Sequence, residues 1–458
     1  MGVWPAAFRG DGFIDVDAGV KQRVAVVGAG WSGLACALAL LDGGADVMLL
    51  DAAPQVGGRA RRVDVQLGDR QFALDNGQHL LIGAYRETLR LMDRVGVVPA
   101  QAFVRVPFGL RYADGFVLAA RRAPAPLHLA FGLAMACGLA WPERVAMARW
   151  VQRQARAGWR LTADVAAIEL FADQPHKLVD RLWEPLCLAA LNVRLAAASG
   201  RVLLAVLRDS LGADRAASDL LLARSDLSRL LPDAAQMSLE HAGAQVRCRH
   251  VVTSLARAGQ GWQLGLRGDV LHVDRVVLAL PPDRAAALLE SVGATTLIDA
   301  VAQLQAIATA PIATVYLRYP TGTRLRDRFN ALTESVAAGC YGQWVFDRGA
   351  VEPENDGVWS VVISGQGPHL ELSRNALVAA VAAQLQGAYA LPAPLAAAVL
   401  VEKRATIVPA PGLRRPPASL PVTGLYLAGD AADSPYPSTI EGSVRAGLQA
   451  ARAVLSAD

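Results

Sequence analysis

A glycine-rich turn near the start of the chain, set between a strand pattern and a helix pattern, constrains the fold more than any other feature of the sequence. Residues 23–28 (RVAVVG) have the pattern of a buried strand, residues 32–43 are small and apolar at helical spacing, and residues 45–51 are a second strand pattern that ends in an acid. A strand, a tight turn, a helix and a strand in this order form the βαβ unit of a parallel sheet. The sequence therefore predicts an α/β fold.

The turn has the spacing of a dinucleotide-binding loop. In Gly28-Ala29-Gly30-Trp31-Ser32-Gly33, the first glycine allows the tight turn, the second lets the backbone approach a pyrophosphate, and the third lets the helix pack on the strand. The helix N-terminus adds free N–H groups and the positive end of its dipole. Asp51 follows at about the 20-residue distance expected of an acid that binds ribose hydroxyls. A glycine turn without a ligand is the structural alternative, but the flanking strand, helix and acid argue against it.

A second glycine motif, Gly57-Gly58-Arg59, comes directly after this unit. The glycine pair allows another close backbone approach to a pyrophosphate, and the arginine can offset the phosphate charge. A glycine turn with a surface arginine is the alternative. Dinucleotide domains that bind only NAD do not need this motif. Its position directly after the first motif therefore makes it a specific sign of a domain that does not bind NAD alone.

A third motif lies near the C-terminus, after a short strand pattern at residues 425–428. Gly429-Asp430 ends the strand, and Ser438-Thr439-Ile440-Glu441-Gly442-Ser443 begins a helix. The aspartate can accept hydrogen bonds from a ribityl chain, and N–H groups of the turn and helix can stabilise negative charge on a flavin ring. The alternative is helix capping by Thr439 and Glu441, and both interpretations can hold together.

In this order, the three motifs resemble those of the FAD-dependent amine oxidoreductase superfamily, which includes monoamine and polyamine oxidases, protoporphyrinogen oxidase and the phytoene desaturases. The resemblance also covers residues 276–282 (VVLALPP). It implies a Rossmann-like FAD-binding domain of the glutathione-reductase type, with an inserted substrate domain made of a mixed sheet and helices. It further implies that FAD is bound by Gly28, Ala29, Gly30, Ser32, Gly33, Asp51, Ala52, Gly57, Gly58, Arg59, Gly77, Gln78, His79, Val252, Gly429, Asp430, Thr439 and Ile440.

Three further segments narrow the resemblance. Residues 75–85 (DNGQHLLIGAY), 182–192 (LWEPLCLAALN) and 402–406 (EKRAT) are similar to the squalene-associated, FAD-desaturase-like proteins, the hydroxysqualene dehydroxylases of bacterial hopanoid biosynthesis. This resemblance covers most of the chain after residue 20. It implies the reduction of hydroxysqualene to squalene with loss of water.

The chain departs from the amine-oxidising members in two places. Those members commonly place a lysine near flavin N5 on a strand of the substrate domain, but residues 312–319 contain no lysine. They also often place an aromatic residue in the last motif, where this chain has Thr439 and Ile440. Both departures favour a hydrocarbon substrate over an amine.

The implied reaction needs a hydride from reduced flavin, a group that protonates the leaving hydroxyl, and a site poor in water. His79 is the first candidate for the acid, followed by Asp75, Glu184 and Lys403. Each has a structural alternative: His79 can hydrogen-bond the flavin or a carbonyl, Asp75 can cap a turn, Glu184 can pair with an arginine, and Lys403 can be an ordinary surface residue. The tryptophans of the helical region can line a tunnel, lie at a membrane interface, or belong to the core: Trp141, Trp150, Trp159 and Trp183.

Two other functions remain open at this point. One is a carotenoid desaturase of the phytoene type, or an amine oxidase, of the same superfamily. The other is a prenyl-lipid binding protein on the same scaffold. Proteins of that kind tend to lose the phosphate-binding glycines, whereas this chain keeps both glycine turns.

The strand and helix patterns alternate between two domains along the chain. An N-terminal extension is expected at residues 1–20. The FAD-binding domain is expected from residues 21–95, 236–290 and 416–458. The substrate domain is expected from residues 96–235, which are mostly helical from about 124, and from residues 291–415, which have the pattern of a mixed sheet.

Composition limits the partners. The net charge is only +4 and basic residues do not form a dense run, so nucleic-acid binding is not expected. The 5 cysteines are scattered without CxxC spacing, which argues against a metal site or a disulfide framework. The apolar window 127–141 is too short to span a bilayer and is expected to form a buried or interfacial helix. We expect a cytoplasmic enzyme with a polyisoprenoid substrate and possible peripheral membrane contact; the oligomeric state is left open.

Overall fold

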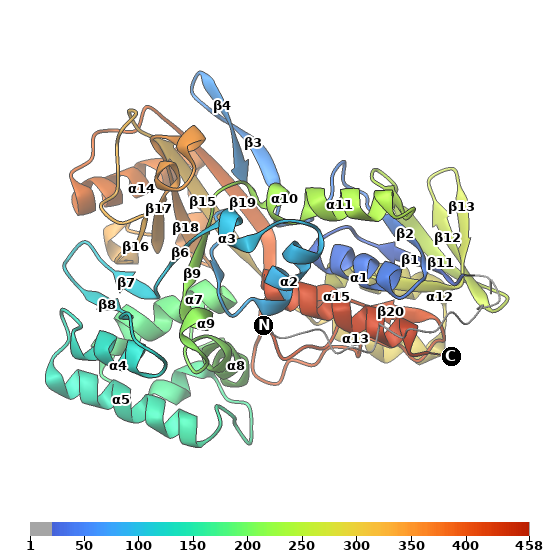
Figure 1. Cartoon of the computed structure of the whole chain (residues 1–458), viewed down its shortest axis with the longest axis horizontal. Helices are drawn as coiled ribbons and strands as arrows, with labels where there is room; N and C mark the ends of the chain where they lie inside the picture. The colour runs from blue at the N-terminus through green and yellow to red at the C-terminus, as the bar shows by residue number, and fades with distance from the viewer. Residues whose placement is uncertain (1–20, 458) are drawn as a thin grey trace.

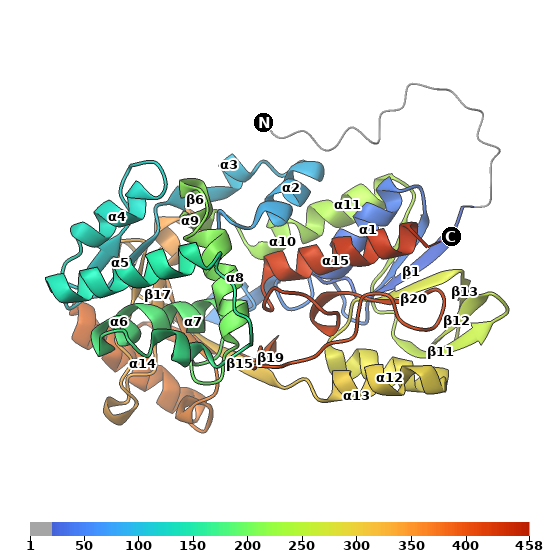
Figure 2. The same cartoon turned by 90° about the horizontal axis from the view of Figure 1, so that it is seen from below.

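The computed structural model describes residues 21–457 and has two lobes (Figure 1). The first lobe is built on a parallel sheet and the second on an antiparallel sheet with a group of helices at its outer end (Figures 1 and 2). The expected N-terminal extension, residues 1–20, lies outside the described residues. In the described part of the chain, no helix is both long and apolar enough to cross a lipid bilayer.

The five-stranded parallel sheet of the first lobe joins segments that are far apart in the sequence. All its pairings are parallel, and β1 lies at its centre with β2 on one side and β14 on the other. Val24 and Val26 of β1 face one apolar core while Ala25 and Val27 face another, as strand alternation requires. In spatial order the strands are β10 (Gln245–Arg247), β2 (Asp46–Leu50), β1 (Arg23–Val27), β14 (Arg275–Leu278) and β20 (Leu425–Leu427).

Helices and a small meander cover the two faces of this sheet. On one face lie α1 (Trp31–Asp42), α2 (Arg86–Arg94), α10 (Leu227–Leu230), α11 (Pro232–His241) and α15 (Ile440–Leu455). On the other lie the meander β11 (Val252–Ala258), β12 (Gly261–Leu266) and β13 (Val270–Val273), with α12 (Pro282–Val292) and α13 (Ile298–Gln305).

Glycines let α1 pack closely against its neighbours. A Cβ at Gly33 would lie 1.8 Å from the carbonyl oxygen of Gly28, and a Cβ at Gly447 of α15 would lie 2.1 Å from that of Ser32. Neither contact leaves room for a side chain. Helix α15, the last that the structure describes, therefore packs directly on α1.

The second lobe contains a five-stranded sheet covered on one face by α14 (Arg374–Tyr389). The sequence predicted a mixed sheet, but all its pairings are antiparallel. Residues 348–357, which connect β17 to β18, hold only short 3-10 turns and not the crossover helix that parallel neighbours need. In spatial order the strands are β16 (Phe329–Ala331), β17 (Trp344–Asp347), β18 (Val358–Ser364), β15 (Thr309–Arg318) and β19 (Ala396–Ile407).

Smaller sheets join this lobe to the rest of the chain. They are the hairpin β3 (Arg62–Leu67) and β4 (Arg70–Asp75), the hairpin β7 (Gly109–Arg111) and β8 (Val117–Ala119), and the sheet β5 (Leu81–Ile82), β9 (Leu220–Ala223) and β6 (Phe103–Val106). β9 lies inside residues 124–233, which were predicted to be mostly helical. It is the central strand of its sheet and pairs with β5 and β6, which come from much earlier in the chain.

Six helices form the helical part of the second lobe: α4 (Leu127–Ala134), α5 (Trp141–Arg156), α6 (His176–Leu178), α7 (Glu184–Leu191), α8 (Gly200–Ser210) and α9 (Arg215–Ser218). The short helix α3 (Pro99–Ala102) lies instead beside α2 (Figure 2). The window 127–141 was expected to be one helix. It instead holds the whole of α4 and the first residue of α5, because the chain turns at Gly138, which has a positive φ of 82°, and Pro142 lies in the first turn of α5.

The core of this end is aromatic. Trp150 and Trp183 are buried and stack with Phe171, with ring centroids 4.9 and 4.6 Å from it. Trp159 packs edge-on against Trp150, whereas Trp141 is 69% exposed. Two of the four tryptophans named from the sequence are therefore fully buried core residues.

Candidate active site

A cavity of about 1040 Å³ lies between the two lobes. It begins at the carboxyl ends of β1 and β2, where Gly28 and Asp51 line it, and reaches β15, β18 and the helices α7 and α8. Ligands of open α/β sheets bind at this edge, outside the carboxyl ends of the strands. The volume is at the upper end of the usual range for ligand sites, which leaves room for a cofactor and a substrate together.

Two glycine turns lie side by side at the first-lobe end of the cavity. Gly30 and Gly57 pair as neighbouring backbone segments, and the N–H of Gly57 donates to the carbonyl of Ala29 at 2.8 Å. Gly28 has a φ of +106°, and a Cβ there would lie 2.3 Å from a backbone oxygen. The turns predicted from the sequence to approach one pyrophosphate thus share one wall of the cavity.

The acid at the end of β2 is held by this turn. Asp51 accepts hydrogen bonds from the backbone N–H of Ala29 at 2.6 Å and of Ala53 at 2.7 Å. Val252 of β11, which was expected to bind FAD, lines the same cavity. Of the predicted cofactor residues, the following line the cavity: Gly28, Gly30, Ser32, Asp51, Ala52, Gly57, Gly58, Arg59, Gly77, Gln78, His79, Val252, Gly429, Asp430, Thr439 and Ile440. Ala29 and Gly33 are not among the lining residues.

Arg59 and Asp430 connect the second motif to the third. Their side chains form an ion pair of 2.5 Å, and Arg59 also donates to the carbonyl of Ala405 at 2.8 Å. Burial alone would raise the pKa of Asp430, but the charge and hydrogen bond of Arg59, with a hydrogen bond from Ser438 at 2.7 Å, hold that pKa below its usual value. Asp430 therefore remains ionised at the cavity wall.

The third motif caps its own helix and also contacts a helix from a distant part of the chain. Thr439 caps α15 by accepting a hydrogen bond from the N–H of Gly442 at 3.0 Å, as the sequence predicted. Glu441 serves a different helix: its buried carboxylate accepts from the N–H and the hydroxyl of Thr88, in the first turn of α2, at 2.9 and 2.8 Å. The carboxylate thereby satisfies free N–H groups at the start of α2.

A buried charge network supports the Gly77-Gln78-His79 loop. Arg348, 5% exposed, lies 3.1 Å from Asp75 and 2.7 Å from Glu352, and donates to the side-chain oxygen of Gln78 at 2.9 Å. Ser360 donates to the same oxygen of Gln78 at 2.9 Å. Gln78 is thus held by two donors from the antiparallel sheet and its 3-10 turn, neither of which was predicted from the sequence.

His79 has one fixed hydrogen bond. Its Nδ1 lies 2.8 Å from the carbonyl oxygen of Gly77, which can only accept, so Nδ1 carries the proton of the neutral ring. Nε2 can donate only when the ring is doubly protonated. Burial lowers the pKa of His79 from its usual 6.5, and the nearby Asp75 and the Gly77 hydrogen bond offset only part of that effect.

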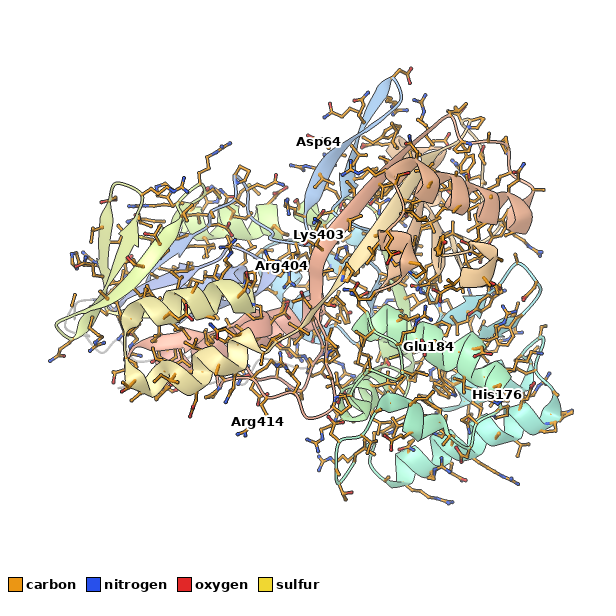
Figure 3. The ribbon with its side chains drawn as sticks, turned by 180° about the vertical axis from the view of Figure 1, so that it is seen from behind. Asp64, His176, Glu184, Lys403, Arg404 and Arg414 are labelled. Atoms are coloured by element: carbon orange, nitrogen blue, oxygen red, sulfur yellow. The ribbon has the colours of Figure 1, made fainter. Side chains whose placement is uncertain are left out.

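The other three acid candidates do not line this cavity. Asp75 is buried with Arg348 and accepts the N–H of Leu227 at 2.8 Å. Glu184, at the start of α7, pairs with Arg194 at 3.3 Å and accepts the N–H of Leu195 at 3.1 Å. Figure 3 shows Lys403 on β19 and Glu184 in the helical part of the second lobe, well apart from each other.

Strand alternation explains the position of Lys403. Leu400 and Glu402 line the large cavity, whereas Val401 and Lys403 line a smaller cavity of about 460 Å³ on the other side of β19. Glu402 is therefore a cavity carboxylate that the sequence reasoning missed, although its segment was singled out. The signal was the period of two along residues 399–403.

The second-lobe end of the cavity is lined by apolar side chains from several elements. Asp209, the charged residue on the helical side of this end, pairs with Arg208 at 2.7 Å. The apolar lining residues include Leu80, Ile82, Phe108, Leu110, Leu186, Leu188, Leu203, Val206, Leu207, Leu211, Leu220, Ile312, Trp344, Phe346, Val362 and Leu400. None of the four tryptophans named from the sequence lines it.

The first-lobe end fits FAD. Gly30 and Thr439 are the N-cap residues of α1 and α15, and both line the cavity, so the positive ends of two helix dipoles face it. The hydroxyl of Ser32 is buried, lines the cavity and has no hydrogen-bond partner among the described residues. Helix N-termini, glycine turns and a free buried hydroxyl are the donors that a diphosphate requires.

Comparison with known proteins agrees with this geometry. Residues 31–455 match the family described as flavin containing amine oxidoreductase. In solved structures the fold resembles cyclohexylamine oxidase from Brevibacterium oxydans, with a TM-score of 0.64 and 20% identity over 95% of this chain and 99% of that chain. It also resembles putrescine oxidase, with a TM-score of 0.67 and 18% identity over 96% of this chain and 100% of that chain.

The chain thus belongs to the flavin-containing amine oxidoreductase family and is an FAD-dependent oxidoreductase. Within it, the chain is 31% identical to hydroxysqualene dehydroxylase of Rhodopseudomonas palustris, over 96% of this chain and 99% of that protein. It is 28% identical to hydroxysqualene dehydroxylase of Sinorhizobium fredii, over 95% and 99% of the two chains. Zeta-carotene desaturase of Synechocystis is more distant, at 22% identity over 95% and 97%.

Proposed function

We propose that this enzyme reduces hydroxysqualene to squalene, with loss of the hydroxyl group as water, in squalene and hopanoid biosynthesis. The observation that carries the proposal is the cavity: a donor-rich end that fits FAD continues into an end lined by leucine, isoleucine, valine and phenylalanine side chains. An apolar lining matches a polyisoprenoid, because burying hydrocarbon away from water is favourable. The relatives named hydroxysqualene dehydroxylase, which align with nearly the whole chain, support the same substrate.

In this reaction a C–O bond breaks, a C–H bond forms, and the hydroxyl leaves as water after taking up a proton. Bound reduced FAD supplies the hydride and therefore both electrons. The chain's own residues exclude water along the apolar wall and supply the proton, because hydroxide is a poor leaving group.

We further propose that the proton comes from Nε2 of His79. His79 is the only one of the four candidates from the sequence that lines the cavity, and its Nδ1 is already occupied by the carbonyl of Gly77. A doubly protonated ring would present an N–H from Nε2. Glu402 of β19 also lines the cavity, where one of its carboxylate oxygens lies 3.4 Å from the side-chain nitrogen of Asn76, and it is the alternative donor.

The direct test is anaerobic. Protein loaded with FAD is reduced with dithionite and mixed with hydroxysqualene, and both flavin reoxidation and squalene formation are followed. We expect the two to occur together in equal amounts. An enzyme that holds its flavin and yields no squalene would remove this function.

The same protein, loaded with FAD and left oxidised, separates the alternative reactions. A carotenoid desaturase or an amine oxidase would instead bleach oxidised flavin in the presence of zeta-carotene or a polyamine. No lysine occurs on β15, the strand expected to carry one in amine oxidases. A prenyl-lipid binding protein would bind the lipid with no change in flavin absorbance.

A further inference from the structure

The outer surface of α4 and α5 carries an unusual group of exposed apolar side chains. Five of the fourteen exposed large apolar side chains of residues 21–457 fall between residues 127 and 145. We call them the α4–α5 patch: Leu127, Phe131, Met135, Trp141 and Val145, exposed by 49, 50, 57, 69 and 40%. Exposed apolar groups that cluster in this way mark an interaction surface.

The patch is continuous across the two helices. Leu127, Phe131 and Met135 recur every four residues, so they lie on one face of α4 and at its end. Arg144 of α5 donates to the carbonyl of Ala136 at 2.7 Å and to that of Ala134, and its guanidinium lies 5.2 Å from the centre of the Trp141 ring. These contacts fix the start of α5, with Trp141, beside the end of α4.

Positive charge is concentrated in the segment of the chain that carries this patch. Residues 115–163 contain seven arginines and one acid, Glu143, so this segment carries a formal charge of +6. The whole chain carries +4, which leaves −2 for all other residues together. Glu143 accepts the N–H of Ala140 at 2.7 Å, and only Arg153 of the seven forms an ion pair with an acid among the described residues, Asp173.

The patch also lies on the outer wall of the cavity. A Cβ at Gly132 of α4 would lie 2.5 Å from the carbonyl oxygen of Ala119 in β8, and β8 pairs with β7, whose Gly109 and Leu110 line the cavity. On the inner side of α4, the buried His128 lies 3.3 Å from the hydroxyl of Ser218, another lining residue. Both views place α4 and α5 at the outer end of the second lobe (Figures 1 and 2).

We propose that the α4–α5 patch docks on the surface of an anionic lipid bilayer. Apolar side chains, an interfacial tryptophan and surrounding arginines are the combination that binds at the boundary between headgroups and acyl chains. Docking would bring the apolar end of the cavity close to the membrane. Entry of a lipid substrate from the membrane into the cavity rests on the proposed function, whereas the docking itself depends only on the α4–α5 patch and its arginines.

The test measures binding to vesicles without substrate. Protein with bound FAD is sedimented with vesicles of equal parts phosphatidylglycerol and phosphatidylcholine, and with vesicles of phosphatidylcholine alone. We expect binding to the anionic vesicles and weaker binding as salt rises, since salt screens the arginines. Failure of the wild-type protein to sediment with anionic vesicles overturns the proposal, whatever the outcome of the squalene assay.

Matched variants locate the surface. We expect Phe131→Ser with Met135→Ser to lower vesicle binding about tenfold or more. Ile298→Ser with Met237→Ser, which changes two side chains exposed by 62 and 55% elsewhere, should leave it unchanged. Arg121→Gln with Arg122→Gln should weaken binding about fivefold per arginine, while Arg267→Gln with Arg326→Gln, an equal change of charge elsewhere, should have little effect. Equal losses in patch and control variants contradict the proposal.

A fluorescence measurement needs only the wild-type protein and one conservative variant, so it does not depend on how well the serine variants fold. Brominated phosphatidylcholine in the anionic vesicles quenches a tryptophan that enters the bilayer interface, and we expect that quenching to disappear in Trp141→Phe, which keeps the patch apolar. Quenching that persists without Trp141 would place the contact elsewhere. Size-exclusion chromatography covers the other occupant: a dimer that the serine variants convert to a monomer, without any lipid binding, would assign the patch to a second copy of this chain.

Discussion

The hydrogen bond from His79 to the carbonyl of Gly77 determines where this ring can hold a transferable proton. Because Nδ1 is occupied, only the doubly protonated ring donates from Nε2. Burial lowers the pKa of His79 below 6.5, so the donating form is populated at acidic pH and lost as pH rises through that lowered value.

We therefore expect the rate of squalene formation by the reduced enzyme to fall with rising pH, with a midpoint below 6.5. His79→Gln should slow this step by roughly 10²- to 10⁴-fold while FAD remains bound. Single-turnover rates measured from about pH 5 to pH 8 check both expectations. A flat profile, or an equal rate in the variant, would exclude His79 and direct attention to Glu402.

At the scale of single residues, the sequence predicted the residue types of the site better than their partners. It named Arg59 and Asp430 as separate ligands of a cofactor, but could not reveal that the two form an ion pair, since 371 positions separate them. It named Lys403 and passed over Glu402, because the choice between neighbouring strand residues depends on which face of β19 points inward.

The packing of α1 against α15 is the contact between elements that is most sensitive to added volume. Gly447 lies inside α15, where alanine would favour the helix by about 1 kcal/mol, but a Cβ there would meet the carbonyl oxygen of Ser32 at 2.1 Å. Gly387 lies inside α14 and has no atom within 4 Å of the corresponding Cβ position. The same substitution should therefore have opposite effects at the two sites.

We expect Gly447→Ala to lower the free energy of unfolding by about 1–3 kcal/mol, because the two helices must separate. Gly387→Ala should raise it by up to about 1 kcal/mol. Denaturant unfolding of both variants with FAD present measures the difference. Equal effects in the two variants would show that α1 and α15 tolerate a wider spacing than the structure gives.

Among elements, those with strong local patterns were predicted closely. The strand pattern at residues 23–28 is β1 (Arg23–Val27), and the helix pattern at residues 32–43 falls within one residue of α1 (Trp31–Asp42). The missed strands are short, such as β9, whose leucines fit a helix equally well and which becomes a strand only through pairing with β5 and β6. The window 127–141 suggested one helix because its residues are apolar on both sides of the turn at Gly138.

For the whole molecule, the cavity lies between two lobes, so a ligand at its first-lobe end also contacts the second. Arg59 of the FAD motif donates to Ala405 of β19, and Thr314 of β15 lies 3.4 Å from the N–H of Gln78. A ligand that binds only the folded chain stabilises it by about 2.7 kcal/mol at 100 times its Kd. FAD should therefore stabilise both lobes together.

We expect removal of FAD to lower the melting temperature by several degrees, and we expect addition of FAD to restore it. Hydrogen exchange should show faster exchange in β15 and β19 of the second lobe as well as in the glycine turns. Faster exchange confined to the first lobe would mean that the cofactor is held by that lobe alone. The order of strands and the meeting of the lobes could not be predicted from the sequence, because both depend on contacts between distant segments.

The position of β20 and α15 also has a consequence for synthesis on the ribosome. The strand beside β14 and the helix on α1 are the last described elements to be made, although they complete a sheet whose central strand is among the first. A nascent chain therefore exposes the uncovered face of α1 and an unpaired edge of β14 until β20 and α15 have been made. During that interval, chaperones that bind exposed apolar surfaces can act on this protein.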